Sequence, residues 1–184
     1  SQVRVDGPDT YWVEGHPLEG GRGTLLRRRG TGETGEVLPL IDGVRLADVG
    51  TRVHEYGGKA YAVHHGVIVF SDRSDGRVYA FDTSEPRRGV RPLTTLSKVR
   101  YGDFWIADER DLVYAVAEDH SGEGEPVNSI VAIPLDGSAA RDDAAIVPVF
   151  GGTDFAQAPT VSPDGTKLAW ISWNHPNMPW TYSQ

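Results

Sequence analysis

The 184-residue sequence contains no cysteine and only one methionine. Without cysteine the chain can form no disulfide, no thiol nucleophile and no thiolate metal site. It also lacks a hydrophobic run long enough to cross a bilayer and an N-terminal signal pattern. Its 18 basic residues are outnumbered by 26 acidic ones, and the net charge of −8 argues against binding to phosphate backbones. We therefore expect a cytoplasmic protein without nucleic-acid, membrane or cofactor partners.

Glycine and proline are plentiful, with 22 and 12 copies, and this composition suits a β protein dense in turns. No segment has a convincing helical period. Strand-like apolar cores recur at residues 10–13, 67–70, 112–115 and 168–171. Their spacing of roughly 45 to 57 residues is close to that of propeller blades. Further strands are expected at residues 23–28, 36–40, 77–82, 90–93, 129–133 and 146–150.

Turn motifs separate these strands. Ser162-Pro163-Asp164-Gly165 is a tight-turn sequence, because proline fixes φ and glycine tolerates positive φ. It connects two expected strands, at residues 157–160 and 167–173. The pattern predicts an all-β fold, a partial β-propeller with about three four-stranded blades plus the start of a fourth. The expected blades cover about residues 1–50, 51–97, 98–152 and 153–184, the last one incomplete.

Residues 52–58, Arg-Val-His-Glu-Tyr-Gly-Gly, followed by Ala60 and Tyr61, resemble the most distinctive propeller signature of the S9 (prolyl oligopeptidase) family. The branch that they resemble is the acylaminoacyl-peptidase and dipeptidyl-aminopeptidase-like one. Three more segments are similar to the same family in the same order, and the four together span nearly the whole chain. These segments are residues 11–15, residues 118–128 and residues 162–180.

The resemblance implies a seven-bladed propeller followed by an α/β-hydrolase domain with a Ser-Asp-His triad. This sequence contains no Gly-x-Ser-x-Gly nucleophile elbow. We therefore expect residues 1–184 to be the N-terminal propeller portion of a serine peptidase, inactive alone and without the catalytic domain. In the parent it would gate and position short peptide substrates over the hydrolase active site. The last four residues, 181–184, depart from the family pattern, and the open propeller edge predicts self-association.

The candidate substrate-lining residues are His54, Glu55, Tyr56, Glu118 and Glu125, and no catalytic residue is expected. His54 and Glu55 could be a base and its orienting acid, although neighbouring strand residues face opposite sides. The alternative is that residues 54–58 pack along an inner strand, where glycines allow close backbone approach. The acidic loop 118–125 is either solvated or, as in some relatives, holds the amino terminus of a peptide.

No metal site is expected. His64 and His65 look like a metal pair, but neighbouring residues of a strand point to opposite faces and cannot readily bind one ion. The spacing in loop 118–125 does not fit an EF-hand. The tryptophans are interpreted as core and inter-blade packing, or alternatively as an aromatic peptide-binding surface. Residues 174–177 are expected to form a tight loop around Pro176.

Two other functions compete with the peptidase interpretation. The first is a free-standing propeller module that binds protein partners, similar to TolB-type repeats. The second is an autonomous hydrolase that uses His54 or His120. The ordered family segments disfavour the first, and the missing nucleophile elbow disfavours the second.

Overall fold

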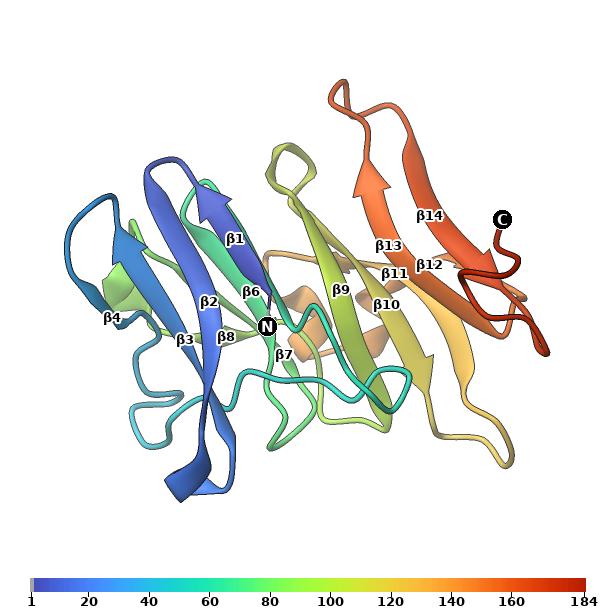
Figure 1. Cartoon of the computed structure of the whole chain (residues 1–184), viewed down its shortest axis with the longest axis horizontal. Coiled ribbons are helices and arrows are strands. Elements are labelled where there is room, and N and C mark those ends of the chain that lie inside the picture. Colours follow the sequence, from blue (N-terminus) through green and yellow to red (C-terminus); the bar gives the residue numbers. More distant parts are fainter. Residues whose placement is uncertain (1) are drawn as a thin grey trace.

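A computed structural model describes residues 2–184, and it consists of four antiparallel sheets, each built from consecutive strands (Figure 1). The first sheet contains β1 (Val3–Asp6), β2 (Asp9–His16), β3 (Arg22–Arg29) and β4 (Thr34–Glu36). The second contains β5 (Tyr61–His64), β6 (Val67–Ser71), β7 (Val78–Asp82) and β8 (Arg91–Pro92). The third contains β9 (Val99–Ala107), β10 (Leu112–Asp119), β11 (Val127–Pro134) and β12 (Val147–Gly151). The fourth pairs β13 (Phe155–Val161) with β14 (Leu168–Trp173).

Helices are few and short. Among residues 2–184 they are five single-turn 3-10 helices: η1 (Pro17–Glu19), η2 (Pro86–Arg88), η3 (Asp108–Arg110), η4 (Ser138–Ala140) and η5 (Asp143–Ala145). No helix in this part of the chain is long and apolar enough to cross a membrane. The predicted all-β class is confirmed.

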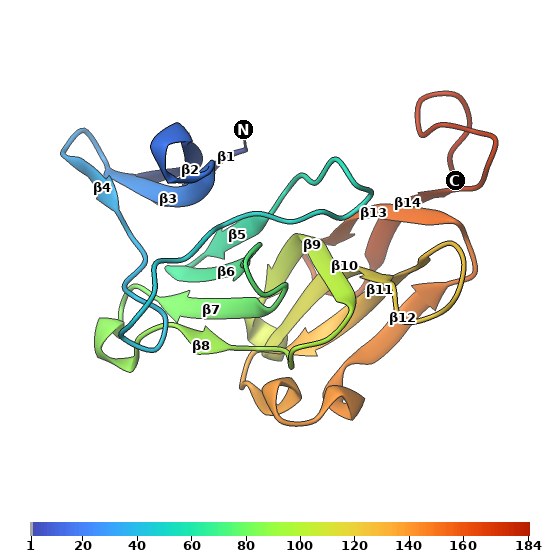
Figure 2. The same cartoon turned by 90° about the horizontal axis from the view of Figure 1, so that it is seen from below.

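The sheets fan out around one common side (Figure 2). Their first strands are neighbours there, with β1 beside β5, β5 beside β9 and β9 beside β13. A cavity of about 420 Å³ opens on this side, lined by residues from all four first strands or their ends. This arrangement, in which each sheet turns its first strand toward a shared axis, is propeller-like.

The core lies between successive sheets rather than inside one barrel. One apolar cluster joins the first and second sheets around Tyr11, Phe70 and Tyr79. A larger cluster joins the second and third sheets around Leu93 and Ile133. Burial of large side chains at these sheet-to-sheet faces is the main source of stability for such a fold.

Several expected strands differ from the observed ones. The prediction of a strand at residues 36–40 is wrong, because β4 ends at Glu36. Pro39 has no N–H that could pair with a neighbouring strand. The first strands β1, β5 and β9 were not among the expected strands. In β9 the alternation is broken at Asp103, whose φ of 54° leaves the extended region, and the ladder with β10 shifts register opposite it.

The turn at residues 162–165 has the predicted chemistry. Gly165 has a φ of 68°, and its N–H donates to the carbonyl of Ser162 at 2.8 Å. The tryptophans, by contrast, are core residues only in part, and Trp170 packs against the buried cluster of Val53, Val116 and Ile130. Trp173 is 5% exposed, but Trp105 is 38% and Trp180 is 77% exposed, so the packing interpretation is wrong for Trp180.

Candidate functional site

A row of three polar side chains crosses the third sheet at one end of its first strand. Arg100 on β9 is the register partner of Glu118 on β10, and Glu118 is in turn the partner of Asn128 on β11. Register partners on adjacent strands share a face of the sheet, so these side chains lie side by side. Glu118 and Asn128 are buried, with 3% and 4% of their surface exposed.

A turn formed by residues 52–57 lies over this row. His54 and Glu55 have φ values of 54° and 64°, and the N–H of His54 donates to Glu118 Oε2 at 2.7 Å. Two successive non-glycine residues at positive φ cannot continue a strand, so the inner-strand interpretation of this segment is wrong. The close backbone approach expected of the glycines is confirmed at Gly57, where an added Cβ would overlap the carbonyl oxygen of Thr51.

Charges concentrate where the turn meets the row. Arg100 Nη1 lies 2.5 Å from Glu55 Oε1 and 3.2 Å from Glu118 Oε1, and it also donates to the carbonyl of Arg52. His120 Nε2 lies 2.6 Å from the same Oε1 of Glu118. The hydrogen bond and charge of Arg100 lower the pKa of the exposed Glu55 carboxyl below its ordinary value. We call His54, Glu55, Tyr56, Arg100, Glu118, His120 and Asn128 the rim site.

The hydrogen-bond network determines the tautomer of His54. Asn128 Nδ2 donates to the carbonyl of Asp154 at 2.8 Å, which leaves Asn128 Oδ1 facing His54 Nε2 at 3.2 Å. Because Oδ1 can only accept, His54 Nε2 carries the proton. In the neutral ring Nδ1 is then the acceptor, and the hydroxyl of Tyr56 lies 3.5 Å from it.

Aromatic rings extend the rim site toward the fourth sheet. The His54 ring meets Phe155 and Trp173 edge to face, at centroid distances of 5.5 and 5.8 Å. Phe155 and Trp173 stack on each other at 5.1 Å, and His175 packs against Phe155. The rim site is thus continuous with an aromatic surface on β13 and β14.

Four of the five candidate residues therefore come together: His54, Glu55, Tyr56 and Glu118. Glu125 does not join them, because it lies in the exposed loop between β10 and β11. Sequence reasoning did not select Arg100 or Asn128 for this site, and it named His120 only in the hypothesis of an autonomous hydrolase. Arg100 and Asn128 lie beside Glu118 only because of the register of three paired strands. No local sequence motif indicates this register.

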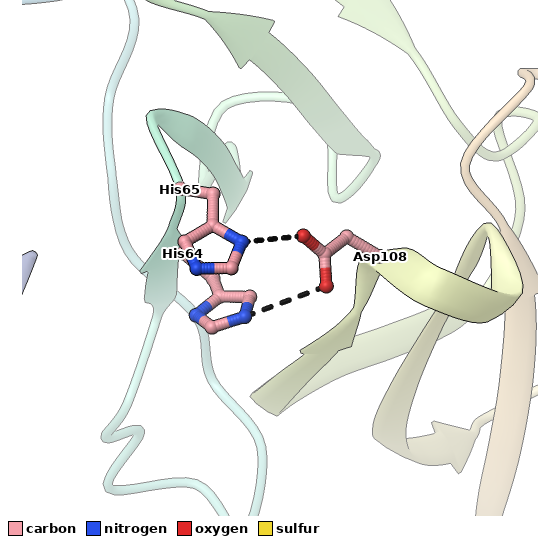
Figure 3. A group of neighbouring side chains, drawn as sticks. All are labelled: His64, His65 and Asp108. Carbon is pink, nitrogen blue, oxygen red and sulfur yellow. Dashed lines mark hydrogen bonds and ion pairs between the residues drawn. The ribbon is translucent and has the colours of Figure 1, made fainter. Parts of the chain in front are cut away.

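A second cluster lies at the far end of β9 (Figure 3). His64 ends β5, and its ring stacks on that of His65 with centroids 4.0 Å apart. Both rings face Asp108, with His65 Nδ1 2.7 Å from Oδ2 and His64 Nε2 3.4 Å from Oδ1. The expectation that the two histidines point to opposite faces is wrong. His65 is outside the strand, at a φ of 48°, and alternation no longer applies to it.

Three solved structures resemble the whole chain. A puromycin hydrolase is 36% identical, with a TM-score of 0.87, over 98% of this chain. A serine-to-alanine mutant of puromycin hydrolase complexed with PGG gives 36% identity, a TM-score of 0.88 and the same coverage. A puromycin-hydrolyzing peptidase of Mycobacterium tuberculosis is 38% identical, with a TM-score of 0.84, over 100% of this chain. The chain spans 29% of the length of each. Neither a scan against protein-family models nor a search of curated proteins gave a match.

Proposed function

Because the chain belongs to the S9 (prolyl oligopeptidase) family of serine peptidases, we propose that it is a non-catalytic part of such an enzyme's propeller. In the parent it gates and positions short peptides over the active site of a C-terminal α/β-hydrolase domain. The observation that carries this proposal is the similarity over the whole chain to peptidases more than three times as long.

The rim site is the part that we propose contacts the peptide. Its residues come from a turn that is exposed at Tyr56, whose surface is 75% accessible, and at Glu55, whose side chain is 76% accessible. Two carboxylates, Glu55 and Glu118, pair with the guanidinium of Arg100, and the charge of Arg52 also acts on Glu55. The exposed carboxylate of Glu55 is the group that favours a cationic part of the substrate.

Glu55 is the residue best placed to hold a peptide's free α-amino group. Glu55 Oε1 accepts a hydrogen bond from Arg100, and this bond orients the carboxylate. Within residues 2–184, no hydrogen bond is made to Glu55 Oε2. The other oxygen remains available for an ammonium, and a charge-assisted contact of this kind is stronger than a neutral one. Glu118 has the different role of positioning, because His54, Arg100 and His120 already surround its buried carboxylate.

The proposal is tested by titrating the 184-residue chain with a tripeptide amide, once with a free and once with an acetylated amino group. NMR shifts of residues 54–56 report the binding. We expect acetylation, or the variant Glu55→Gln, to weaken binding about tenfold, the loss of one charge-assisted contact. The matched variant Glu125→Gln, in the exposed loop, should bind as the parent chain does. Equal affinity for both peptides, or weakening by Glu125→Gln alone, would contradict the assignment.

A further inference from the structure

His64, His65 and Asp108 form a cluster that the proposed peptide site does not use. Arg100, in the rim site, and Asp108 lie at opposite ends of β9, about 25 Å apart for a strand that rises about 3.3 Å per residue. We propose that this cluster is a Zn²⁺ site that fastens the second sheet to the third at the mouth of the shared cavity.

The local fold brings the two imidazoles together. His65 and Gly66 link β5 to β6 in a two-residue turn, and both have positive φ, at 48° and 80°. Asp6 at the end of β1 holds this turn, because its two carboxylate oxygens accept from the N–H groups of His65 and Gly66 at 3.0 and 2.7 Å. The turn therefore directs the His65 ring onto the His64 ring instead of away from it.

Asp108 comes from a different sheet. It is the first residue after β9, in η3, and its Oδ1 accepts a hydrogen bond from the N–H of Glu109 at 3.1 Å. This bond orients the carboxylate toward the two histidines, in the way that hydrogen bonds from neighbouring groups orient metal ligands. The cluster thus has one carboxylate and two imidazoles from two separate chain segments.

The donor set and its spacing match zinc. One nitrogen of each histidine and one oxygen of Asp108 lie within 4.8 Å of one another. Zinc binds imidazole nitrogen and carboxylate oxygen at about 2.0–2.2 Å in a tetrahedron, which separates two donors by about 3.4 Å. His64 Nε2 lies 3.4 Å from Asp108 Oδ1, and His65 Nδ1 lies 2.7 Å from the other oxygen, Oδ2. A shared ion would therefore use both carboxylate oxygens, and the 2.7 Å pair would have to open by less than 1 Å.

The surroundings also favour a cation. Asp6 and Glu109 lie near His65 and add negative charge. The three side chains are 43%, 71% and 30% exposed, which leaves an entry path and room for a water as fourth ligand. His64 and Glu109 both line the 420 Å³ cavity, so a bound ion would lie where β5 and β9 meet at its mouth.

The rim site also has three potential ligands close together, Glu55, Glu118 and His120. Arg100, however, already contacts both of its carboxylates, and its guanidinium would repel a second cation. We therefore expect no Zn²⁺ binding at the rim site, which serves as the control for binding at the His64, His65 and Asp108 cluster.

The test is isothermal titration calorimetry of the 184-residue chain with zinc chloride, combined with thermal unfolding. We expect one Zn²⁺ per chain and a rise of Tm with zinc, because an ion that binds only the folded state stabilises it. The variants His64→Gln, His65→Asn and Asp108→Asn should each weaken binding about tenfold or more. Asparagine is used at position 65 because it tolerates positive φ.

Two control variants make the experiment specific. His175→Gln removes a histidine whose Nδ1 lies 3.1 Å from a single carboxylate, that of Asp154. His120→Gln removes the rim-site histidine that lies beside Glu55 and Glu118. Both should bind Zn²⁺ as the parent chain does, and the chain has no cysteine that could bind it instead. No binding by the parent chain, or unchanged binding after His64→Gln and Asp108→Asn, would overturn the proposal.

Discussion

Glu118 is the residue on which the rim site depends. Its side chain is only 4% exposed, and its two oxygens receive the N–H of His54, the guanidinium of Arg100 and the ring nitrogen of His120. A buried carboxylate is tolerated only when donors replace the water that it loses. Here those donors include the backbone of the 52–57 turn, so Glu118 connects the conformation of that turn to the third sheet.

Replacing Glu118 should therefore destabilise the fold. The variant Glu118→Gln keeps the shape of the side chain but removes its charge and presents an amide N–H₂ to groups that are themselves donors. We expect the free energy of unfolding to fall by about 1.5–3 kcal/mol, as for hydrogen bonds to charged groups. Urea denaturation measures this loss. Glu125→Gln, in the exposed loop, should stay within about 0.5 kcal/mol of the parent chain, and equal losses in both variants would contradict this role.

Asp164 provides a test of local electrostatics. Hydrogen bonds from the Ser162 hydroxyl and from the N–H and hydroxyl of Thr166 lower its pKa from 3.8 to about 2. Because the folded pKa is depressed, ionised Asp164 contributes stability above pH about 4, and this contribution is lost as the pH falls through about 2. Carboxyl NMR should find a pKa near 2, and Ser162→Ala should raise it toward 3.8. An ordinary pKa in the parent chain would mean that this turn network does not form in solution.

Among the structural elements, the 52–57 turn is stabilised by two kinds of contact, backbone hydrogen bonds and apolar packing. The N–H groups of Glu55 and Gly57 donate to the carbonyls of Arg52 and Val53. Val53 is buried and packs with Val116 and Ile130 of the third sheet. The turn is thus fixed by its own backbone bonds and by an apolar anchor, which allows His54 and Glu55 to keep positive φ.

Three glycines distinguish two reasons why a position requires glycine, a positive φ and a lack of room for a Cβ. Gly57 combines a φ of 69° with an overlap of any Cβ on Thr51, Gly58 has only a φ of 127°, and Gly35 has neither. Substitution by alanine should cost most at Gly57, about 1–2 kcal/mol at Gly58, and least at Gly35. Thermal unfolding of the three variants gives the order. A Gly35→Ala variant less stable than Gly57→Ala would contradict the packing described here.

The sequence predicts elements well where apolar residues cluster, and less well where the backbone departs from regular geometry. Strands β6 and β10 were predicted because Val67 and Leu112 begin uninterrupted apolar runs. Strand β9 was not predicted, because its regular alternation is interrupted at Asp103. The error at His64 and His65 has an identifiable cause, because His65-Gly66 is a two-residue hairpin sequence and a turn there ends the alternation.

At the scale of the whole molecule, the rim site could be predicted only in part. The motif around His54 and Glu55 was recognised by resemblance, and its turn conformation was not. Arg100 and Asn128 join Glu118 through the pairing of three strands, each brought into register by its own turns and apolar face. No local pattern in the sequence shows which residues of neighbouring strands are paired, so this part of the rim site could not be predicted.

From the fourth sheet we predict that the chain associates with itself in solution. Among residues 2–184 it consists of two strands, and Phe150, Leu168 and Trp170 line an open apolar hollow of about 400 Å³ beside it. Exposed edges and apolar faces favour association. We expect light scattering to show a mass above 20.0 kDa that rises with concentration, and Leu168→Glu to reduce it. A sharp monomer of the parent chain at high concentration would be the opposite result.

The role that we propose for these 184 residues is to position a substrate, without performing the chemistry of hydrolysis. Nucleophilic catalysis by serine needs a base within hydrogen-bonding reach, and in the part of the chain described here no serine hydroxyl is hydrogen-bonded to a histidine. The most direct test is to incubate the purified chain with an aminoacyl p-nitroanilide and with a serine-directed fluorophosphonate. We expect no hydrolysis above buffer and no labelled chain. Stoichiometric labelling, together with turnover that the label abolishes, would contradict it.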